Sequence, residues 1–283
     1  MARTRLAPLA RLLSTHNADL IALAQLALCA HAHDTWFAVR AAALPGTLVV
    51  ALGTGNQFPR QEFPVDSEHL QEQGCRQAGQ AIALAAIAKA STALLLQAKA
   101  PSGAAVTCWS QLVRFEIELA PDKIGPYLDE INASPRLVES WAAMRTRGLR
   151  WRERYVKSAR VEIAAGTDGD TPAPAANRVP MEMDVLLQSG LQRLHPGEAL
   201  VVQVLRDGLP LPDFPIELRG AGPGWARWFK TDAQGRVSTG APEPGKWVWR
   251  GTDLRLSTTD IDVWESRFVT LSFEVHAPPS SAR

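Results

Sequence analysis

The sequence lacks the features that mark several common protein classes. With 30 basic and 29 acidic residues and a formal net charge of +1, it has no surplus of positive charge for binding nucleic acid, so we exclude a nucleic-acid partner. It has no Gly-x-Ser-x-Gly motif, and no Ser/His/Asp set is evident in the local sequence. We therefore expect a non-enzymatic protein.

Long apolar runs are also missing beyond the N-terminal region. The segment 78–100 comes nearest, but Gln80, Lys89 and Lys99 interrupt it. A helix that spans a membrane needs about 20 consecutive apolar residues. We expect no transmembrane segment beyond a signal peptide.

The N-terminal region has the pattern of an export signal. Arg3, Arg5 and Arg11 precede an apolar run over residues 20–30, and Ala30-His31-Ala32 has the small residues that signal peptidase requires. We predict a signal peptide over residues 1–32, secretion through the Sec pathway to the periplasm, and a mature chain that begins at His33. An ordinary amphipathic helix is the alternative interpretation.

Cysteine is scarce, with three residues in the chain, of which Cys75 and Cys108 follow the predicted cleavage site. In an oxidising compartment this pair permits a disulfide, which would stabilise the fold by roughly 3 kcal/mol for a loop of about 34 residues. Two buried free thiols are the alternative, because sequence spacing alone does not decide between them.

The first half of the mature chain is predicted to be a β domain over residues 33–165. Strand-like alternation occurs over residues 47–52 and 112–119. A helical insertion is predicted at about 121–147, where apolar residues recur at intervals of three and four. Ser134 followed by Pro135 is a typical start for its second helix.

Residues 166–178 have the composition of a linker, and the pattern changes beyond them. Short alternating strands separated by turns are typical of a small immunoglobulin-like or prealbumin-like β-sandwich. We predict this sandwich over residues 179–276, followed by a disordered tail at 277–283. The predicted fold is therefore mainly β, with two β-sandwich domains. The expected C-terminal strands span residues 198–205, 216–218, 225–230, 247–250 and 268–275.

Several short motifs, taken in order, resemble those of one family. They are His33-Asp-Thr-Trp-Phe37, Arg152-Glu-Arg-Tyr-Val-Lys157, Leu194-His-Pro-Gly-Glu198, Val204-Leu-Arg-Asp-Gly-Leu-Pro-Leu211, Thr231-Asp-Ala-Gln-Gly-Arg236, Pro244-Gly-Lys-Trp247, Trp264-Glu-Ser266 and Thr270-Leu-Ser-Phe273. This order resembles the domain-of-unknown-function family DUF4198, whose members are often labelled NikM-like periplasmic nickel/cobalt transport components. The resemblance implies a periplasmic protein without known catalysis, a role in transition-metal uptake or homeostasis, and a membrane transport component as partner.

A metal site is predicted at the new N-terminus. The free α-amine and the imidazole of His33 can chelate Cu(II), Ni(II) or Co(II), and Asp34 can add an oxygen ligand. Completing the site calls for one of the three further histidines of the mature chain, which are His69, His195 and His276. Family members often carry a histidine in the strand after the Pro-Gly-x-Trp turn, whereas this chain has Asp253 near that place.

Two other functions remain open at this stage. The C-terminal sandwich is a candidate interaction module for a protein or a glycan, with Trp225 and Trp228 as candidate contacts. They stand three residues apart, so on one strand they would face opposite sides. The remote alternative is a copper monooxygenase, which holds its metal with an N-terminal histidine and a second histidine facing it.

Overall fold

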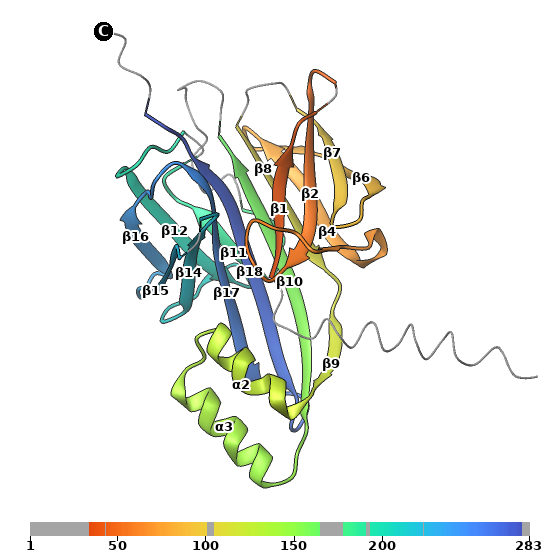
Figure 1. Cartoon of the computed structure of the whole chain (residues 1–283), viewed down its shortest axis with the longest axis vertical. Helices are drawn as coiled ribbons and strands as arrows, with labels where there is room; N and C mark the ends of the chain where they lie inside the picture. The colour runs from red at the N-terminus through yellow and green to blue at the C-terminus, as the bar shows by residue number, and fades with distance from the viewer. Residues whose placement is uncertain are drawn as a thin grey trace, which may run out of the picture.

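The computed structural model describes residues 34–42, 44–100, 105–164, 178–190, 193–222 and 224–278. These residues are mainly β, with two α-helices between the strands (Figure 1). The predicted mainly β fold is therefore confirmed. The predicted signal peptide, all but the last residue of the predicted linker and the end of the predicted tail lie outside the described residues.

Three sheets make up the described β structure. The N-terminal sheet contains β1 (Asp34–Arg40), β2 (Thr47–Gly55), β7 (Leu94–Lys99) and β6 (Leu84–Lys89) in that order, with β3 (Phe63–Pro64) beside β2. The central sheet runs β15 (Ala226–Lys230), β14 (Pro215–Gly220), β17 (Gly245–Leu256), β18 (Trp264–Val275), β10 (Trp151–Ile163), β8 (Val106–Leu112), β4 (Leu70–Gln77) and β5 (Gln80–Ile82), with β9 (Phe115–Leu119) also on β10. The C-terminal sheet contains β11 (Met183–Leu187), β12 (Ala199–Arg206) and β13 (Leu209–Pro210), with β16 (Arg236–Gly240) beside β12.

The central sheet is continuous across both predicted domains. Strand β10 pairs in parallel with β18, from Glu153↔Trp264 to Val161↔Ser272, and antiparallel with β8 on its other side. Each predicted sandwich therefore contributes strands to one shared sheet, and backbone hydrogen bonds join the two.

The two hydrophobic cores lie on opposite faces of this shared sheet. Ala159 and Val161 of β10 belong to the core beneath the N-terminal sheet, whereas Val269 and Leu271 of β18 belong to the core beneath the C-terminal sheet. Ala159 stands beside Thr270 in the register, so the residues on either side of Thr270 point to the other face. One sheet thus forms a layer of both sandwiches.

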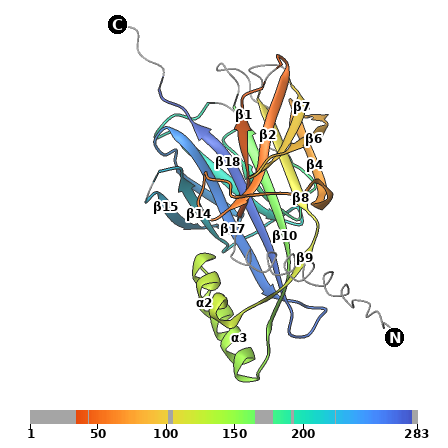
Figure 2. The same cartoon turned by 45° about the vertical axis from the view of Figure 1, so that its right-hand side comes forward.

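Helices α2 (Pro121–Glu130) and α3 (Pro135–Thr146) lie at one end of the long strands β10, β17 and β18 (Figures 1 and 2). Their buried residues pack around Trp151 and Trp264, whose rings stack at a centroid distance of 4.5 Å. This core includes Leu254 and Phe268, so the helices cover strands from both predicted domains. No helix among the described residues has the length and apolar character needed to cross a membrane.

Side-chain hydrogen bonds hold strand β1 in place. The hydroxyl of Thr270 on β18 donates to the carbonyl of Thr35 at 2.6 Å. The buried amide of Gln61 donates to the carbonyls of Trp36 and Ala51, at 2.9 and 3.0 Å. These bonds hold β1 and the loop before β3 in place, and both contribute to the cleft described below.

Candidate functional site

The predicted metal ligands begin at His33, which lies outside the described residues. The next residue, Asp34, is 8% exposed at the start of β1, and its Oδ2 lies 2.5 Å from Nη1 of Arg250 on β17. The carboxylate is therefore already neutralised by a guanidinium. In this arrangement Asp34 is placed as an ion-pair partner rather than as a free oxygen ligand.

Arg250 also contacts two further carboxylates. Its Nε donates to Glu217 on β14, and Nη1 lies 3.3 Å from Oε1 of Glu130 at the end of α2. Burial disfavours the charged guanidinium, but Asp34 and Glu217 outweigh that effect and raise the pKa of Arg250. Burial raises the pKa of Glu130 despite the opposing effect of Arg250. This cluster ties β1, α2 and the central sheet together.

The other predicted ligands occupy separate places. The ring of His69 packs edge-on against Phe115, with centroids 5.0 Å apart. Asp253 lies 3.5 Å from Nη1 of Arg206 and also binds Arg255. Burial raises the pKa of Asp253. Across the residues that the structure describes, no group of three or more His, Cys, Asp or Glu side chains is arranged to hold a metal ion.

The structure does bring His195 and His276 together. Nδ1 of His195 lies 3.2 Å from the backbone carbonyl of His276, so Nδ1 must carry the proton and donate it. Burial lowers the pKa of His276 from its ordinary 6.5, against the opposing effect of Glu274. This imidazole is therefore neutral at neutral pH.

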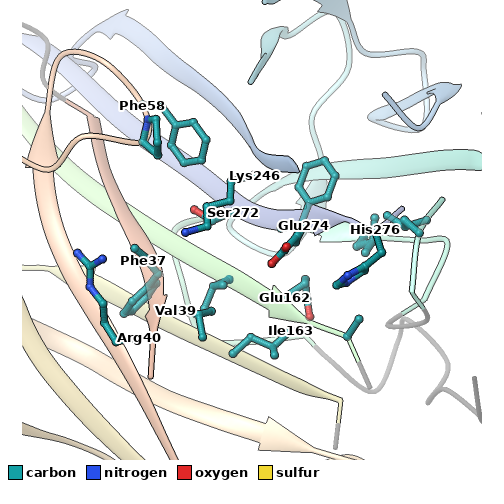
Figure 3. A pocket seen from close by; sticks show the side chains of 17 residues that line it. Phe37, Val39, Arg40, Phe58, Glu162, Ile163, Lys246, Ser272, Glu274 and His276 are labelled. Atoms are coloured by element: carbon teal, nitrogen blue, oxygen red, sulfur yellow. The ribbon is translucent and has the colours of Figure 1, made fainter. Parts of the chain in front are cut away.

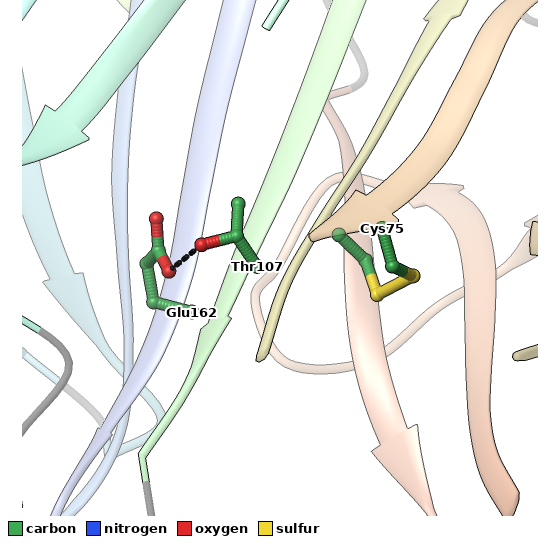
Figure 4. Close-up of a disulfide and its surroundings, with 4 residues drawn as sticks. Cys75, Thr107 and Glu162 are labelled. Atoms are coloured by element: carbon green, nitrogen blue, oxygen red, sulfur yellow. Dashed lines mark hydrogen bonds between the residues drawn. A yellow bond between two sulfur atoms is a disulfide. The ribbon is translucent and has the colours of Figure 1, made fainter. Parts of the chain in front are cut away.

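Cys75 on β4 and Cys108 on β8 form a disulfide in the N-terminal core (Figure 4). They are directly paired residues of adjacent antiparallel strands, with Cα atoms 4.0 Å apart. The neighbouring Thr107 points to the opposite face of the sheet, where its hydroxyl donates to Oε2 of Glu162 at 2.5 Å. The bridge thus links two strands of the central sheet.

A cleft of about 300 Å³ opens where β10 and β18 stop pairing. Their last paired residues are Val161 and Ser272; beyond them β10 continues beside β8, and β18 continues beside β17. The two parallel strands therefore diverge at their carboxyl ends. The end of β1 and the loop that contains Phe58 form further walls (Figure 3), and Leu187, Leu194 and Lys246 also line the cleft.

The walls of this cleft are mostly apolar. Phe37, Val161, Leu187, Leu194 and Phe273 are each at most 6% exposed. Val39, Phe58 and Ile163 lie nearer to solvent. A concave apolar site of this size with a few polar groups is typical of sites that bind small molecules.

Charged and polar groups are distributed around these walls. Figure 3 shows Arg40 on the β1 side of the cleft, with Glu274 and His276 across it. Lys246 of β17 stands directly opposite Glu274 in the register of the sheet. The hydroxyl of Ser272 is buried and makes no hydrogen bond within the described residues.

Glu162 is the most buried of the charged residues that line the cleft. It is 6% exposed, and Nε of Arg160 donates to its Oε1 at 2.6 Å. Nη1 of the same guanidinium contacts Asp184 on β11 at 2.9 Å. Burial raises the pKa of both Glu162 and Asp184, although Arg160 opposes the shift. This cluster links β10 to the C-terminal sheet, and Glu162 is already hydrogen-bonded on both oxygens.

Sequence reasoning did not identify this cleft, because its residues are far apart in the chain. The local signal is the alternation from Ser272 to His276, where the polar residues line the cleft and the apolar Phe273 and Val275 belong to the C-terminal core. Phe273 also borders the cleft. Of the predicted ligands that the structure describes, His276 alone contributes to the cleft wall.

Comparison with known proteins gives a family but no activity. A family model described as Domain of unknown function (DUF4198) matches residues 30–250. The chain belongs to this family. The DUF4198 match includes β1, β10 and Lys246, whereas Ser272, Glu274 and His276 lie beyond it. No curated protein matches the chain.

One similar solved structure is described as the D0-D1 domain of Intimin. It is 12% identical in sequence, and the match covers 86% of this chain and 97% of the Intimin chain. The TM-score is 0.19, which is too low to inform either the fold or the function of the DUF4198 chain.

Proposed function

We propose that this protein is an exported, non-enzymatic binding protein that holds a small organic molecule in the cleft between β10 and β18. The observation that carries the proposal is the cleft itself, with its apolar walls, its charged residues and the hydroxyl of Ser272, which has no hydrogen-bond partner among the described residues. Buried polar groups without partners are uncommon in folded proteins, so such a hydroxyl at the wall of a cleft favours a ligand that bonds to it.

Two observations support export. The sequence before His33 has the pattern of a cleaved signal peptide. In addition, Cys75 and Cys108 form a disulfide. Structural disulfides persist in oxidising compartments such as the periplasm and are rare in the cytosol.

The arrangement of side chains favours binding over catalysis. Ser272 carries the one hydroxyl and His276 the one imidazole among the described residues of the cleft. They are four residues apart on a nearly extended segment, which separates their Cα atoms by about 13 Å. A nucleophile and its base need direct hydrogen-bond contact. Because Glu162 is bonded to Thr107 and Arg160, it is not free to act as a base.

A transition-metal role is the second candidate, and one observation favours it. The ring of His195 contacts the backbone carbonyl of His276, and His276 lines the cleft. Two imidazoles make only part of a metal site, since stable sites in proteins use about four ligands. We therefore place this role behind the binding of an organic molecule.

The proposal is tested with a panel of small amino acids, carboxylates, amines and sugars, followed by ligand-observed NMR. We expect members of one class to bind and to be recovered chemically unchanged. Val39→Trp should abolish that binding, because the indole would fill the cleft at a position that is 43% exposed. Val138→Trp is the matched control, since Val138 is 46% exposed on α3, away from the cleft. Equal binding by both variants would contradict the proposal.

A further inference from the structure

The polar groups of the cleft have a definite spacing. Ser272 and Glu274 alternate along β18 and face the same side, with Cα atoms about 6.6 Å apart. Lys246 on β17 is the direct partner of Glu274, so the two Cα atoms are about 5 Å apart. A hydroxyl, an ammonium and a carboxylate therefore converge on one small region of the cleft wall.

Of the three groups, the hydroxyl of Ser272 points most directly to a bound ligand. Ser272 is 5% exposed and lines the cleft, and its Oγ has no hydrogen-bond partner in the described part of the chain. A buried hydroxyl without a partner is unfavourable, and a ligand atom that bonds to it would remove that cost. A hydroxyl donates well to a carboxylate, and hydrogen bonds to charged groups are the stronger kind.

Charges of both signs are exposed beside this hydroxyl. Lys246 and Glu274 are both exposed, and Arg40 bonds through Nη2 to the neutral amide of Gln61 at 3.1 Å. Glu274 also lies near the neutral His276. A ligand with a single charge would satisfy one of these signs and face repulsion from the other. A ligand that carries a positive and a negative charge close together would pair with both the acidic and the basic side chains.

The apolar walls and the volume restrict the rest of the ligand. A cleft of about 300 Å³ holds roughly ten water molecules, because each occupies about 30 Å³ in the liquid. Phe37, Phe58 and Ile163 provide apolar surface beside the charged groups. A side chain such as that of leucine or phenylalanine has the size and character that these walls accept, whereas a sugar would leave its hydroxyls facing them.

From this spacing we infer that the cleft binds a free α-amino acid with an apolar side chain. Its carboxylate would accept hydrogen bonds from Ser272 and Lys246, and its ammonium would donate to Glu274. The side chain would lie against Phe37 and Phe58. The inference rests on the proposed binding function, and it adds the class of ligand.

The test uses calorimetry on the full mature chain with leucine and phenylalanine, and with analogues of leucine that each lack one group. These analogues are 4-methylpentanoate without the amine, 3-methylbutylamine without the carboxylate, and glycine without the side chain. We expect leucine or phenylalanine to bind at least tenfold more tightly than every analogue. If 4-methylpentanoate binds as well as leucine, recognition of both charges is ruled out. If neither amino acid binds, the inference fails, while a hit from another class in the NMR panel would leave the proposed function standing.

Two substitutions locate the site. Ser272→Ala and Glu274→Gln should each weaken leucine binding about tenfold, which corresponds to the loss of one charge-assisted hydrogen bond. Glu139→Gln is the matched control, since Glu139 is exposed on α3, and it should bind leucine normally. Thermal unfolding of each variant checks that the fold is intact. Normal leucine binding by the folded Ser272→Ala and Glu274→Gln variants would overturn the assignment.

Discussion

The carboxylate of Asp34 and the guanidinium of Arg250 lie 2.5 Å apart, although 216 positions separate them in the chain. This contact joins the first described strand to the middle of β17, and Glu217 and Glu130 complete the cluster. A guanidinium that is 7% exposed thus neutralises carboxylates from three distant parts of the sequence.

Replacing Arg250 with methionine should destabilise the protein strongly. The substitution keeps most of the side-chain volume but leaves Asp34 buried without a counter-charge, and it leaves Glu217 with Arg219 as its remaining guanidinium partner. Removing one partner of a buried ion pair typically costs about 3–5 kcal/mol. The control is Arg150→Met, because Arg150 is 78% exposed and pairs with the exposed Glu118. An exposed pair contributes about 0–1 kcal/mol. Urea unfolding measures both, and equal losses would show that the Arg250 cluster contributes no more than a surface pair.

Glu153 should make the stability depend on pH in a predictable direction. Its buried carboxylate accepts hydrogen bonds from Trp151 at 2.6 Å, from Tyr127 at 2.9 Å and from Ser266. Burial raises the pKa of Glu153 above its ordinary 4.5. The folded state therefore holds this proton more tightly than the unfolded state, so its contribution is largest below pH 4.5 and falls as the pH rises through the raised value.

The comparison with Glu153→Gln isolates this effect, because glutamine does not titrate. We expect the stability of the parent protein relative to the variant to decrease as the pH is raised from about 4 toward 7. Denaturant unfolding at several pH values measures the difference. An increase over this range would mean that the hydrogen bonds lower the pKa of Glu153 instead.

The two sandwiches should remain associated after the chain is cut between Ala164 and Arg178. The parallel pairing of β10 with β18 and the contact between Arg160 and Asp184 both cross this point. Limited proteolysis followed by gel filtration without denaturant should give one species that contains both fragments. The sequence also predicts that residues 179–276 fold alone, but that fragment would lack β10 beside β18. Separation of two folded fragments on the column would show that the shared sheet contributes little.

The predicted metal site at the N-terminus has its own test. A chain that begins at His33 should bind one Cu(II), Ni(II) or Co(II), and binding should weaken as the pH falls through about 8 and 6.5, where the α-amine and the imidazole gain protons. One extra residue before His33 should remove most of the affinity. Asp34→Asn should leave the affinity unchanged, because this carboxylate is paired with Arg250. Equal calorimetric affinity of the chains with and without the extra residue would eliminate the site.

Export is checked by the mass of the mature protein. After expression with residues 1–32, the protein recovered from the periplasm should begin at His33, because Ala30-His31-Ala32 precedes it. Intact-mass spectrometry measures this directly. A full-length chain in the cytoplasm would contradict both export and the N-terminal metal site that depends on it.

The local sequence pattern predicted which helices and strands occur more accurately than it predicted the residues at which they end. The sequence predicts a helical insertion at about 121–147 with a second helix that starts at Pro135, and the structure has helices at Pro121–Glu130 and Pro135–Thr146. One strand was expected over residues 112–119, but the structure breaks it at Val113 and Arg114. The break occurs because β8 and β9 pair with different parts of β10, residues 158–163 and 151–155. Pairing with a distant strand, rather than local alternation, sets those ends.

The sequence by itself determined the mainly β class, the helical pair and the faces on which apolar residues lie, because these depend on neighbours two to four positions away. The tertiary structure decided which strands are adjacent. The pairing of Val161 with Ser272, and the divergence of their strands beyond that point, create the cleft. Alternation assigns a residue to a face of a strand but not to a partner strand. For this reason the meeting of Ser272, Lys246 and Glu274 with Phe37 follows from long-range pairing alone.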